Sequence, residues 1–196
     1  MTPAASIRVW DRFVRLFHWG LVAAFFTAWA ATDSIGWVHK GAGYLTVALV
    51  TARVLWGFVG SHHARFVHFV PGPRKLLAYL QALARGREPR HLGHNPAGAM
   101  MVLALMAAVL GIGVTGWMMT LDAFWGNDVV ESMHTLLVDV TLVAVAVHVL
   151  ANVLGGLRHR ENLIVAMVTG NKSAHASYGA SCLPPVDLDG RTRPSR

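Results

Sequence analysis

Residues 133–155 read MHTLLVDVTLVAVAVHVLANVLG, and this stretch decides the fold. As an α-helix, which rises about 1.5 Å per residue, it is long enough to cross the roughly 30 Å hydrocarbon core of a bilayer. Backbone polar groups inside a bilayer must be satisfied within the segment, so a single run of this length predicts a helix. One carboxylate, Asp139, and two histidines, His134 and His148, interrupt its apolar character.

Three earlier blocks, residues 16–31, 41–59 and 97–121, have the same apolar character. Hydrophobic residues make up 54% of the chain and mean hydropathy is +0.45, which is too high for an ordinary soluble domain of this length. The first block is short but extends through Phe13 and Val14. We therefore predict an all-α, integral membrane four-helix bundle over residues 1–172, with spans at about 14–31, 40–59, 97–121 and 132–155.

The net charge of +7 follows the predicted topology. Basic residues precede the first span, fill the link between the second and third, and follow the fourth, whereas Lys40 is the only cation in the other two links. Those two links carry Asp33, Asp122, Asp128 and Glu131. The positive-inside pattern predicts that both termini are cytoplasmic, and because topology explains the charge we expect no nucleic-acid partner.

The segments outside the spans carry their own signals. Leucines at 76, 77, 80 and 83 predict a helix over residues 73–84 that lies on the cytoplasmic membrane surface, and residues 161–168 are a second short candidate. Residues 173–196 are polar and rich in Pro, Gly and Arg, so we expect a disordered tail. The single cysteine, Cys182, can form no internal disulfide and supplies no thiolate cluster.

Four of the 11 histidines lie where histidine is uncommon, inside or at the ends of the predicted spans. Fourteen residues separate His134 from His148, about 21 Å of rise and nearly four whole turns, so both rings leave one helix face at different depths. His18 begins the first span on the inner side, and His39 begins the second on the outer side. The depths therefore pair His18 with His148, and His39 with His134.

Such pairs suit haem iron, because imidazole is a good axial ligand and facing helices of a bundle hold this cofactor. Two histidines per iron fill both axial positions, which favours electron transfer over oxygen chemistry. The alternatives are helix–helix hydrogen bonds, and a zinc site, which four histidines at two depths do not form around one ion. The sequence thus favours His18, His148, His39 and His134 as haem iron ligands.

Three further residues are candidates for a role beside these pairs. Arg53 falls at the depth of His18 and His148, where it either pairs with a haem propionate or extends to the interface. Asp139 has no partner that the sequence identifies. His94, at the inner mouth of the third span, is a candidate for a quinone or partner site.

Several motifs together resemble the bacterial cytochrome b561 family, which includes the b-type subunit of nickel–iron hydrogenases. The order and spacing of the motifs over about residues 8–172 make the resemblance specific; at Asp139 the family pattern has Asn. The motifs are Val9-Trp10-Asp11-Arg12, Arg15-Leu16-Phe17-His18-Trp19, His39 with Gly41 and Gly43, Arg53, Gly60-Ser61-His62-His63-Ala64-Arg65-Phe66, Gly93-His94-Asn95-Pro96, the His134/His148 pair and Arg158-His159-Arg160-Glu161-Asn162-Leu163.

The resemblance implies a multi-pass cytochrome of the bacterial inner membrane that holds two haems b. It implies that His18 and His148 ligate the cytoplasmic-side haem and that His39 and His134 ligate the outer one. Members exchange electrons with quinone or quinol and with a periplasmic cytochrome or dehydrogenase subunit. A homodimer is left open.

Three functions remain in view from the sequence. The first is a di-haem electron carrier between quinone and a redox partner. The second is a superoxide:quinone oxidoreductase, which the acidic outer links disfavour because that reaction needs a cationic outer surface. The third is a haem-bearing membrane anchor of a dehydrogenase, hydrogenase or cytochrome c complex, for which the acidic link around Asp122 offers a docking surface. A transporter is disfavoured because broken helices and paired repeats are missing from the sequence.

Overall fold

Four long apolar helices dominate the chain. The computed structural model describes residues 6–32, 35–89, 91 and 93–173, and within these ranges four helices are long and apolar enough to cross a membrane. They are α1 (Arg12–Ala30), α2 (Gly36–Val59), α5 (Pro96–Met118) and α6 (Asp128–His159). The shorter elements are β1 (Ser6–Arg8), η1 (His62–Ala64), α3 (Phe66–Phe69), α4 (Pro73–Ala84), η2 (Asp122–Phe124), α7 (Leu163–Thr169) and β2 (Asn171–Ser173).

Side-chain caps fix where three of the long helices begin. The Asp11 carboxylate accepts a hydrogen bond from Val14 N at 2.8 Å at the start of α1. Asn95 accepts from Gly98 N at 2.7 Å at the start of α5, with Pro96 as the first helical residue, where a missing N–H costs nothing. Asn127 caps α6 in the same way. α5 therefore begins at Pro96, one residue before the predicted span of 97–121.

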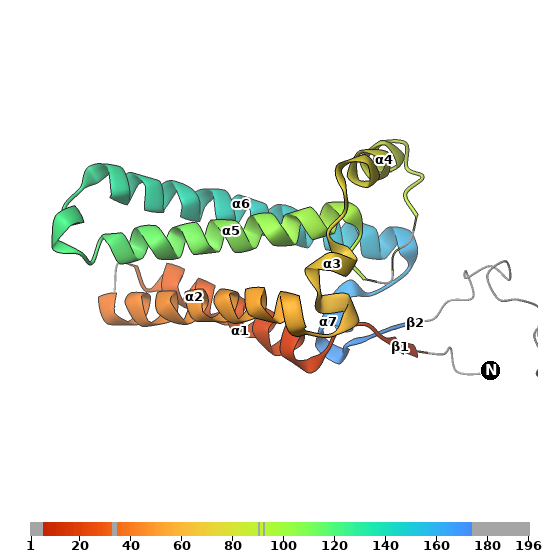
Figure 1. The fold of residues 1–196 in the computed structure, drawn as a ribbon, viewed down its shortest axis with the longest axis horizontal. Coiled ribbons are helices and arrows are strands. Elements are labelled where there is room, and N and C mark those ends of the chain that lie inside the picture. Colours follow the sequence, from red (N-terminus) through yellow and green to blue (C-terminus); the bar gives the residue numbers. More distant parts are fainter. Residues whose placement is uncertain (1–5, 33–34, 90, 92, 174–196) are drawn as a thin grey trace, which may run out of the picture.

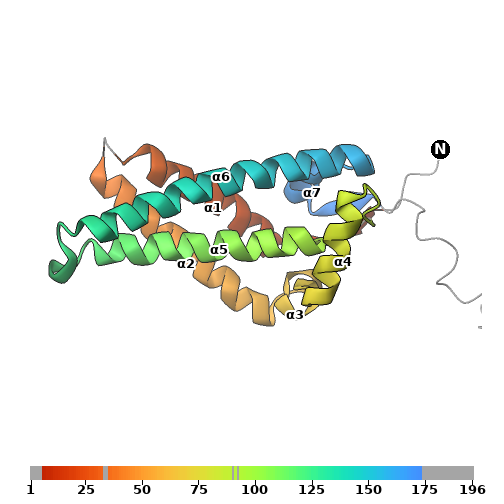
Figure 2. The same ribbon diagram turned by 90° about the horizontal axis from the view of Figure 1, so that it is seen from above.

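The helices form two layers, with α1 beside α2 and α5 beside α6 (Figure 1). Contacts of α2 with α5 join the layers, whereas no extensive backbone contact within the described residues links α6 to α1 or α2. Figure 2 shows α5 and α6 running antiparallel along the molecule. A core of Phe17, Val50, Met106 and Val109 lies where α1, α2 and α5 meet. The prediction of an all-α membrane bundle is confirmed.

The two ends of the bundle differ in character. The end that holds β1, η1, α3, α4, α7 and β2, here called the basic end, comprises residues 6–11, 60–89, 91, 93–95 and 160–173 (Figure 1). The opposite end, here called the acidic end, comprises residues 31–32, 35 and 119–127. Lys40 is the only Lys or Arg near the acidic end, beside Asp122, Asp128 and Glu131. Placing the basic end in the cytoplasm follows the positive-inside rule and stays a prediction.

The basic end contains a two-stranded sheet that the sequence analysis did not predict. β1 pairs antiparallel with β2, and Ile7 lies opposite Lys172. The Arg15 guanidinium also donates to the Val168 carbonyl. α4 and α7 match the two predicted short helices, and three leucines of α4 (Leu77, Leu80 and Leu83) are exposed, as a helix lying on a membrane surface requires. The predicted disordered tail falls, from residue 174 onward, outside the described residues.

Candidate functional site

His39 and His134 lie close together near the acidic end. His39 is in the first turn of α2, and His134 lies two turns into α6. Their ring centroids are 6.3 Å apart, with an angle of 67° between the ring planes. Both side chains are half-buried. The pairing by depth that the sequence predicts is therefore matched by proximity at this end of the bundle.

The same ring nitrogen is occupied in both histidines. His39 Nδ1 lies 2.8 Å from the Ala28 carbonyl oxygen of α1. His134 Nδ1 lies 3.0 Å from Thr115 Oγ1, and that hydroxyl is 2.9 Å from the Gly111 carbonyl oxygen, to which it donates. A carbonyl only accepts, and a hydroxyl that donates elsewhere accepts here, so in each neutral ring Nδ1 carries the proton. Both Nε2 lone pairs are left for another ligand.

His18 and His148 are the corresponding residues toward the basic end. His18 is in the second turn of α1, and it lies close enough to His148 of α6 for an electrostatic interaction between the two rings. His18 Nδ1 is buried and has no hydrogen-bond partner. His148 Nε2 faces the Asn152 amide nitrogen of the same helix at 3.3 Å. The two histidines belong to α1 and α6, two helices that make no extensive backbone contact within the described residues.

Arg53 is buried beside the loop that follows α2. Its side chain is 2% exposed, so it does not extend to the surface, which was one of the two expectations for it. Its Nη2 donates to the Ala64 carbonyl at 3.0 Å, and the guanidinium lies 5.6 Å from the Phe66 ring centroid and 5.9 Å from that of Phe69. Its Nη1 is buried without a partner. A buried cation with an unused donor is suited to an anionic group.

Asp139 points away from the histidines. At about 100° per residue it lies roughly 140° around the α6 axis from His134 and roughly 180° from His148. Its side chain is exposed on the outer surface of the bundle. Within the described part of the chain no hydrogen bond or ion pair reaches the carboxylate. It therefore has no contact with the histidine pairs.

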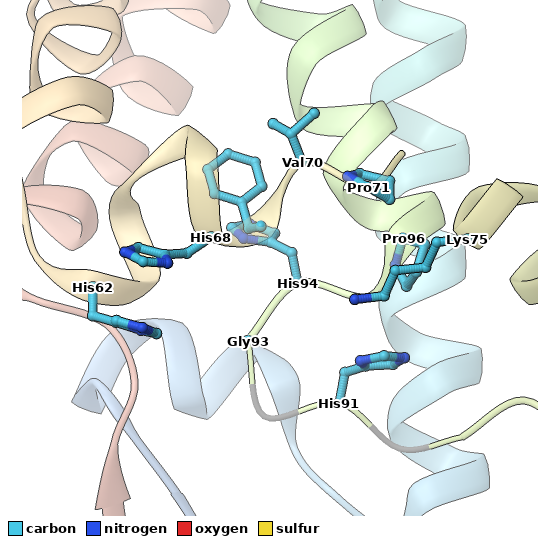
Figure 3. A pocket seen from close by; sticks show the side chains of 10 residues that line it. His62, His68, Val70, Pro71, Lys75, His91, Gly93, His94 and Pro96 are labelled. Atoms are coloured by element: carbon cyan, nitrogen blue, oxygen red, sulfur yellow. The ribbon is translucent and has the colours of Figure 1, made fainter. Parts of the chain in front are cut away.

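A polar cavity of about 190 Å³ opens at the basic end (Figure 3). In Figure 3 the Lys75 side chain and the His91 ring approach it from one side, and His62 and His68 lie on the other. The rings of His62 and His68 are stacked, with centroids 3.9 Å apart. The described lining contains no carboxylate; its polar and aromatic members are His62, His68, Phe69, Lys75, His91 and His94.

His94 lines this cavity and interacts electrostatically with both histidines of the inner pair. Its ring packs against Trp10 at 4.7 Å and Phe69 at 5.0 Å between centroids. Burial, followed by the nearby Arg53 charge, lowers the pKa of His94 to about 3, so the ring is neutral at physiological pH. Its Nδ1 is buried without a partner, as is Nε2 of His91, whose pKa is also lowered by burial. The cavity therefore presents two unused imidazole nitrogens.

Asp11 ties the start of α1 to the end of α2. Besides capping α1, its carboxylate accepts from Trp56 Nε1 at 3.1 Å and from Ser61 Oγ. Burial alone raises the pKa of Asp11, but hydrogen bonds from Ser61, Val14 and Trp56 outweigh it, so the net pKa is lowered. In the sequence, Asp11 stands out only as part of a motif, and no pattern predicts a role for Thr115, Asn152 or the cavity histidines other than His94.

Four membrane-spanning helices, with the histidine rings of α2 and α6 close together between them, define a multi-pass membrane protein whose bundle is suited to a histidine-ligated cofactor. The profile of the prokaryotic cytochrome b561 family matches residues 9–170, so the chain belongs to this family. Membership makes it a b-type cytochrome that binds haem b. The resemblance drawn from the motifs is confirmed.

Curated relatives share one description. A protein of Bradyrhizobium diazoefficiens named probable Ni/Fe-hydrogenase B-type cytochrome subunit is 29% identical over 168 residues, which cover 70% of this chain and 66% of the relative. A protein of Azotobacter vinelandii with the same name is 31% identical over 165 residues, covering 69% and 67%. The chain thus spans about two thirds of the length of these relatives. No solved structure matches it.

Proposed function

We propose that this cytochrome holds two haems b and carries electrons across the membrane between a redox partner at the acidic end and the quinone pool. His39 and His134 bind one haem, and His18 and His148 bind the other. Bound in this way, haem b supplies a one-electron couple with no open coordination site. The proposal extends to hydrogenase as the partner because the relatives carry the name of hydrogenase cytochrome subunits.

The separation of His39 and His134 carries the proposal. A metal–imidazole nitrogen bond is about 2 Å long, and the ring centroid lies about 1 Å further out, so two imidazoles on opposite sides of one iron have centroids roughly 6 Å apart. The observed distance is 6.3 Å. The tautomers agree, because hydrogen bonds from Nδ1 to Ala28 and Thr115 orient both rings and leave Nε2 to the iron.

Room for two flat cofactors is supported by the packing. α6 packs mainly on α5, and within the described residues it makes no extensive backbone contact with α1 or α2, which carry His18 and His39. At the inner pair, His18 Nδ1 and Arg53 Nη1 are buried polar atoms without a hydrogen-bond partner. A haem and its propionates would supply partners for both atoms. Arg53 would then set both the local charge and the position of the haem.

The basic end supports the quinone side of the proposal. His94 lines the polar cavity and interacts electrostatically with both His18 and His148 of the inner pair. A quinone headgroup has carbonyl oxygens that accept hydrogen bonds, and Lys75, His91 and His94 offer donors around the cavity. A neutral His94 can also pass a proton when the headgroup is reduced.

Haem counting tests the proposal. A pyridine-haem assay and a redox-difference spectrum on purified protein are expected to give two low-spin haems b per chain. His148→Ala and His39→Ala are each expected to leave one, and the matched control His159→Ala, at the end of α6, to leave both. A fully loaded His148→Ala protein would overturn the ligand assignment.

The anchor function differs from the carrier function in one observable. A chain that only anchors a partner does not react with quinone alone, whereas the proposed carrier does. Dithionite-reduced purified protein mixed with a soluble quinone analogue is expected to reoxidise its haems, and His94→Ala to slow this reaction with haem content unchanged. If the haems of the isolated, fully loaded protein stay reduced in the presence of the quinone analogue, the anchor function holds instead.

A further inference from the structure

The outer face of α6 carries a carboxylate where lipid would be expected. Between Glu131 and Arg158, Asp139 is the only Asp, Glu, Lys or Arg in the sequence. Those two charges bracket the part of α6 that crosses the hydrocarbon core, so Asp139 lies within it. A carboxylate at membrane depth is costly, and such residues nearly always face a partner group or a water-filled cavity. Here it is exposed.

Asp139 belongs to an exposed stripe at helix-packing spacing, here called the Asp139 face. Its members recur every three or four residues, on the side of α6 opposite the histidines. All are exposed, Leu136 by 62% and Leu157 by 72%, and α6 is the least covered long helix, with 6% of its most apolar window buried against 17–22% in the others. The face comprises Ser132, Leu136, Asp139, Val143, Ala146, Leu150, Val153 and Leu157.

The part of this face nearest the acidic end is polar and contains a hollow. A shallow hollow lined by Asp128, Val129, Ser132, Met133 and Leu136 lies at its acidic end. The face and the hollow together therefore combine small residues, the Ser132 hydroxyl and the carboxylates of Asp128 and Asp139 with leucine and valine. Helices that associate inside membranes use this mixture, because small residues allow close approach and polar ones hydrogen-bond across the contact.

We propose that the Asp139 face docks a single membrane-spanning helix of a partner subunit, which places a cationic or hydrogen-bond-donating side chain opposite Asp139. Charge complementarity selects this occupant over a second copy. A symmetric α6–α6 contact would bring Asp128 and Asp139 of both copies together, and like charges in a membrane repel strongly. A lipid tail would leave the carboxylate without a partner. The inference rests on the partner-linked function proposed above.

Photocrosslinking in native membranes tests the proposal. A benzophenone amino acid replaces Val143 on the face or, as a matched control, Val114 of α5, which is also exposed. The expected result is an adduct at 143 and not at 114 whose peptide map places a partner's transmembrane segment, with a Lys, Arg, His, Ser, Thr, Asn or Gln at the depth of Asp139. Combining the probe with Asp139→Leu is expected to lower the adduct on the order of tenfold, and Asp139→Asn to keep it.

A pair of substitutions checks the surface without changing Asp139. Ala146 lies on the face and Ala151 lies off it, and both are exposed on α6. Ala146→Trp is expected to block co-purification of the partner, and Ala151→Trp to leave it intact. An adduct of twice the chain's own mass would overturn the proposal in favour of a homodimer. Equal lipid adducts at 143 and 114 would show that no helix docks there.

Haem content, read from the same membranes, separates this proposal from the function. Two haems without a partner adduct would remove the docking proposal and leave the carrier intact. An adduct without haem would remove the carrier and leave the docking surface.

Discussion

Thr115 of α5 holds His134 of α6 through a hydrogen bond of 3.0 Å between Oγ1 and Nδ1. The hydroxyl is itself fixed, because it lies 2.9 Å and 3.0 Å from the carbonyl oxygens of Gly111 and Ile112. Gly116 follows on the same helix, where an added Cβ would come within 3.1 Å of the His134 ring. One turn of α5 thus sets both the tautomer and the position of this imidazole.

Removing the Thr115 hydroxyl is expected to weaken haem binding at the acidic end. Groups that orient a metal-ligating histidine typically change affinity by about 10–100-fold. Thr115→Val should therefore lose haem more readily during purification, and the absorption spectrum should show one affected haem. Thr141→Val is the control, because that buried threonine bonds only to the Leu137 carbonyl. Equal haem retention in the two variants would contradict the role of Thr115.

His94 is expected to make the protein acid-sensitive. Its pKa is about 3 in the folded chain and 6.5 ordinarily, so between these values the unfolded chain binds the extra proton. Stability is therefore lost as pH falls from 6.5 toward 3, by up to about 1.4 kcal/mol per pH unit. His94→Gln should flatten the fall in melting temperature across this window in detergent. If melting temperature falls equally with pH in the wild-type protein and in His94→Gln, this role of His94 is contradicted.

Asp11 is expected to stabilise the junction between α1 and α2. Asp11→Ala removes the cap of α1 and the acceptor for Trp56 and Ser61, a loss of about 2–3 kcal/mol. Asp11→Asn should recover part of this because an amide oxygen still caps. Thermal unfolding in detergent measures both. Asp122→Ala, an exposed acidic residue at the other end, serves as control; a melting temperature for Asp11→Ala equal to that of this control would refute the role.

Gly113 is expected to be essential for the contact of α5 with α2. A Cβ at this position would overlap the Val47 side chain, whereas one at Gly41 meets nothing within 4 Å. Gly113→Ala should cost about 1–3 kcal/mol through overpacking, and Gly41→Ala should cost less. Adding Val47→Ala to Gly113→Ala should restore part of the loss in melting temperature. If the double variant recovers none of the melting temperature, the cost of Gly113→Ala does not arise from its contact with Val47.

The membrane helices were predictable because their signals are local. Apolar length identified all four, and the Asn95 cap followed by Pro96 is a local signal for the start of α5. α6 runs longer than its predicted span of 132–155 because it continues past the apolar stretch at both ends, from the Asn127 cap to Arg160 in the left-handed conformation (φ 52°). Hydropathy predicts which residues lie in the lipid, but it does not predict where the helical hydrogen bonds end.

Contacts between distant segments were not predictable. The pairing by depth of His39 with His134 follows from counting residues along helices, so the sequence sufficed. The cavity joins His62 and His68 from one segment to Lys75 and His91 from others, and no periodicity relates them. Thr115 looks like any small polar residue in a span, since only the packing of α5 on α6 shows which histidine it meets.

The pairing of β1 with β2 and the hydrogen bond from Arg15 to Val168 impose an order on the folding of the chain during synthesis. The partners are 153 residues apart in the latter contact, and at about 5–20 residues per second the ribosome needs roughly 8–30 seconds to make that interval. During that delay α1 is already made but its amino-terminal strand has no mate. The contacts at the basic end therefore cannot form until residues 168–173 have been made, which leaves a period for cofactor delivery before β2 pairs with β1.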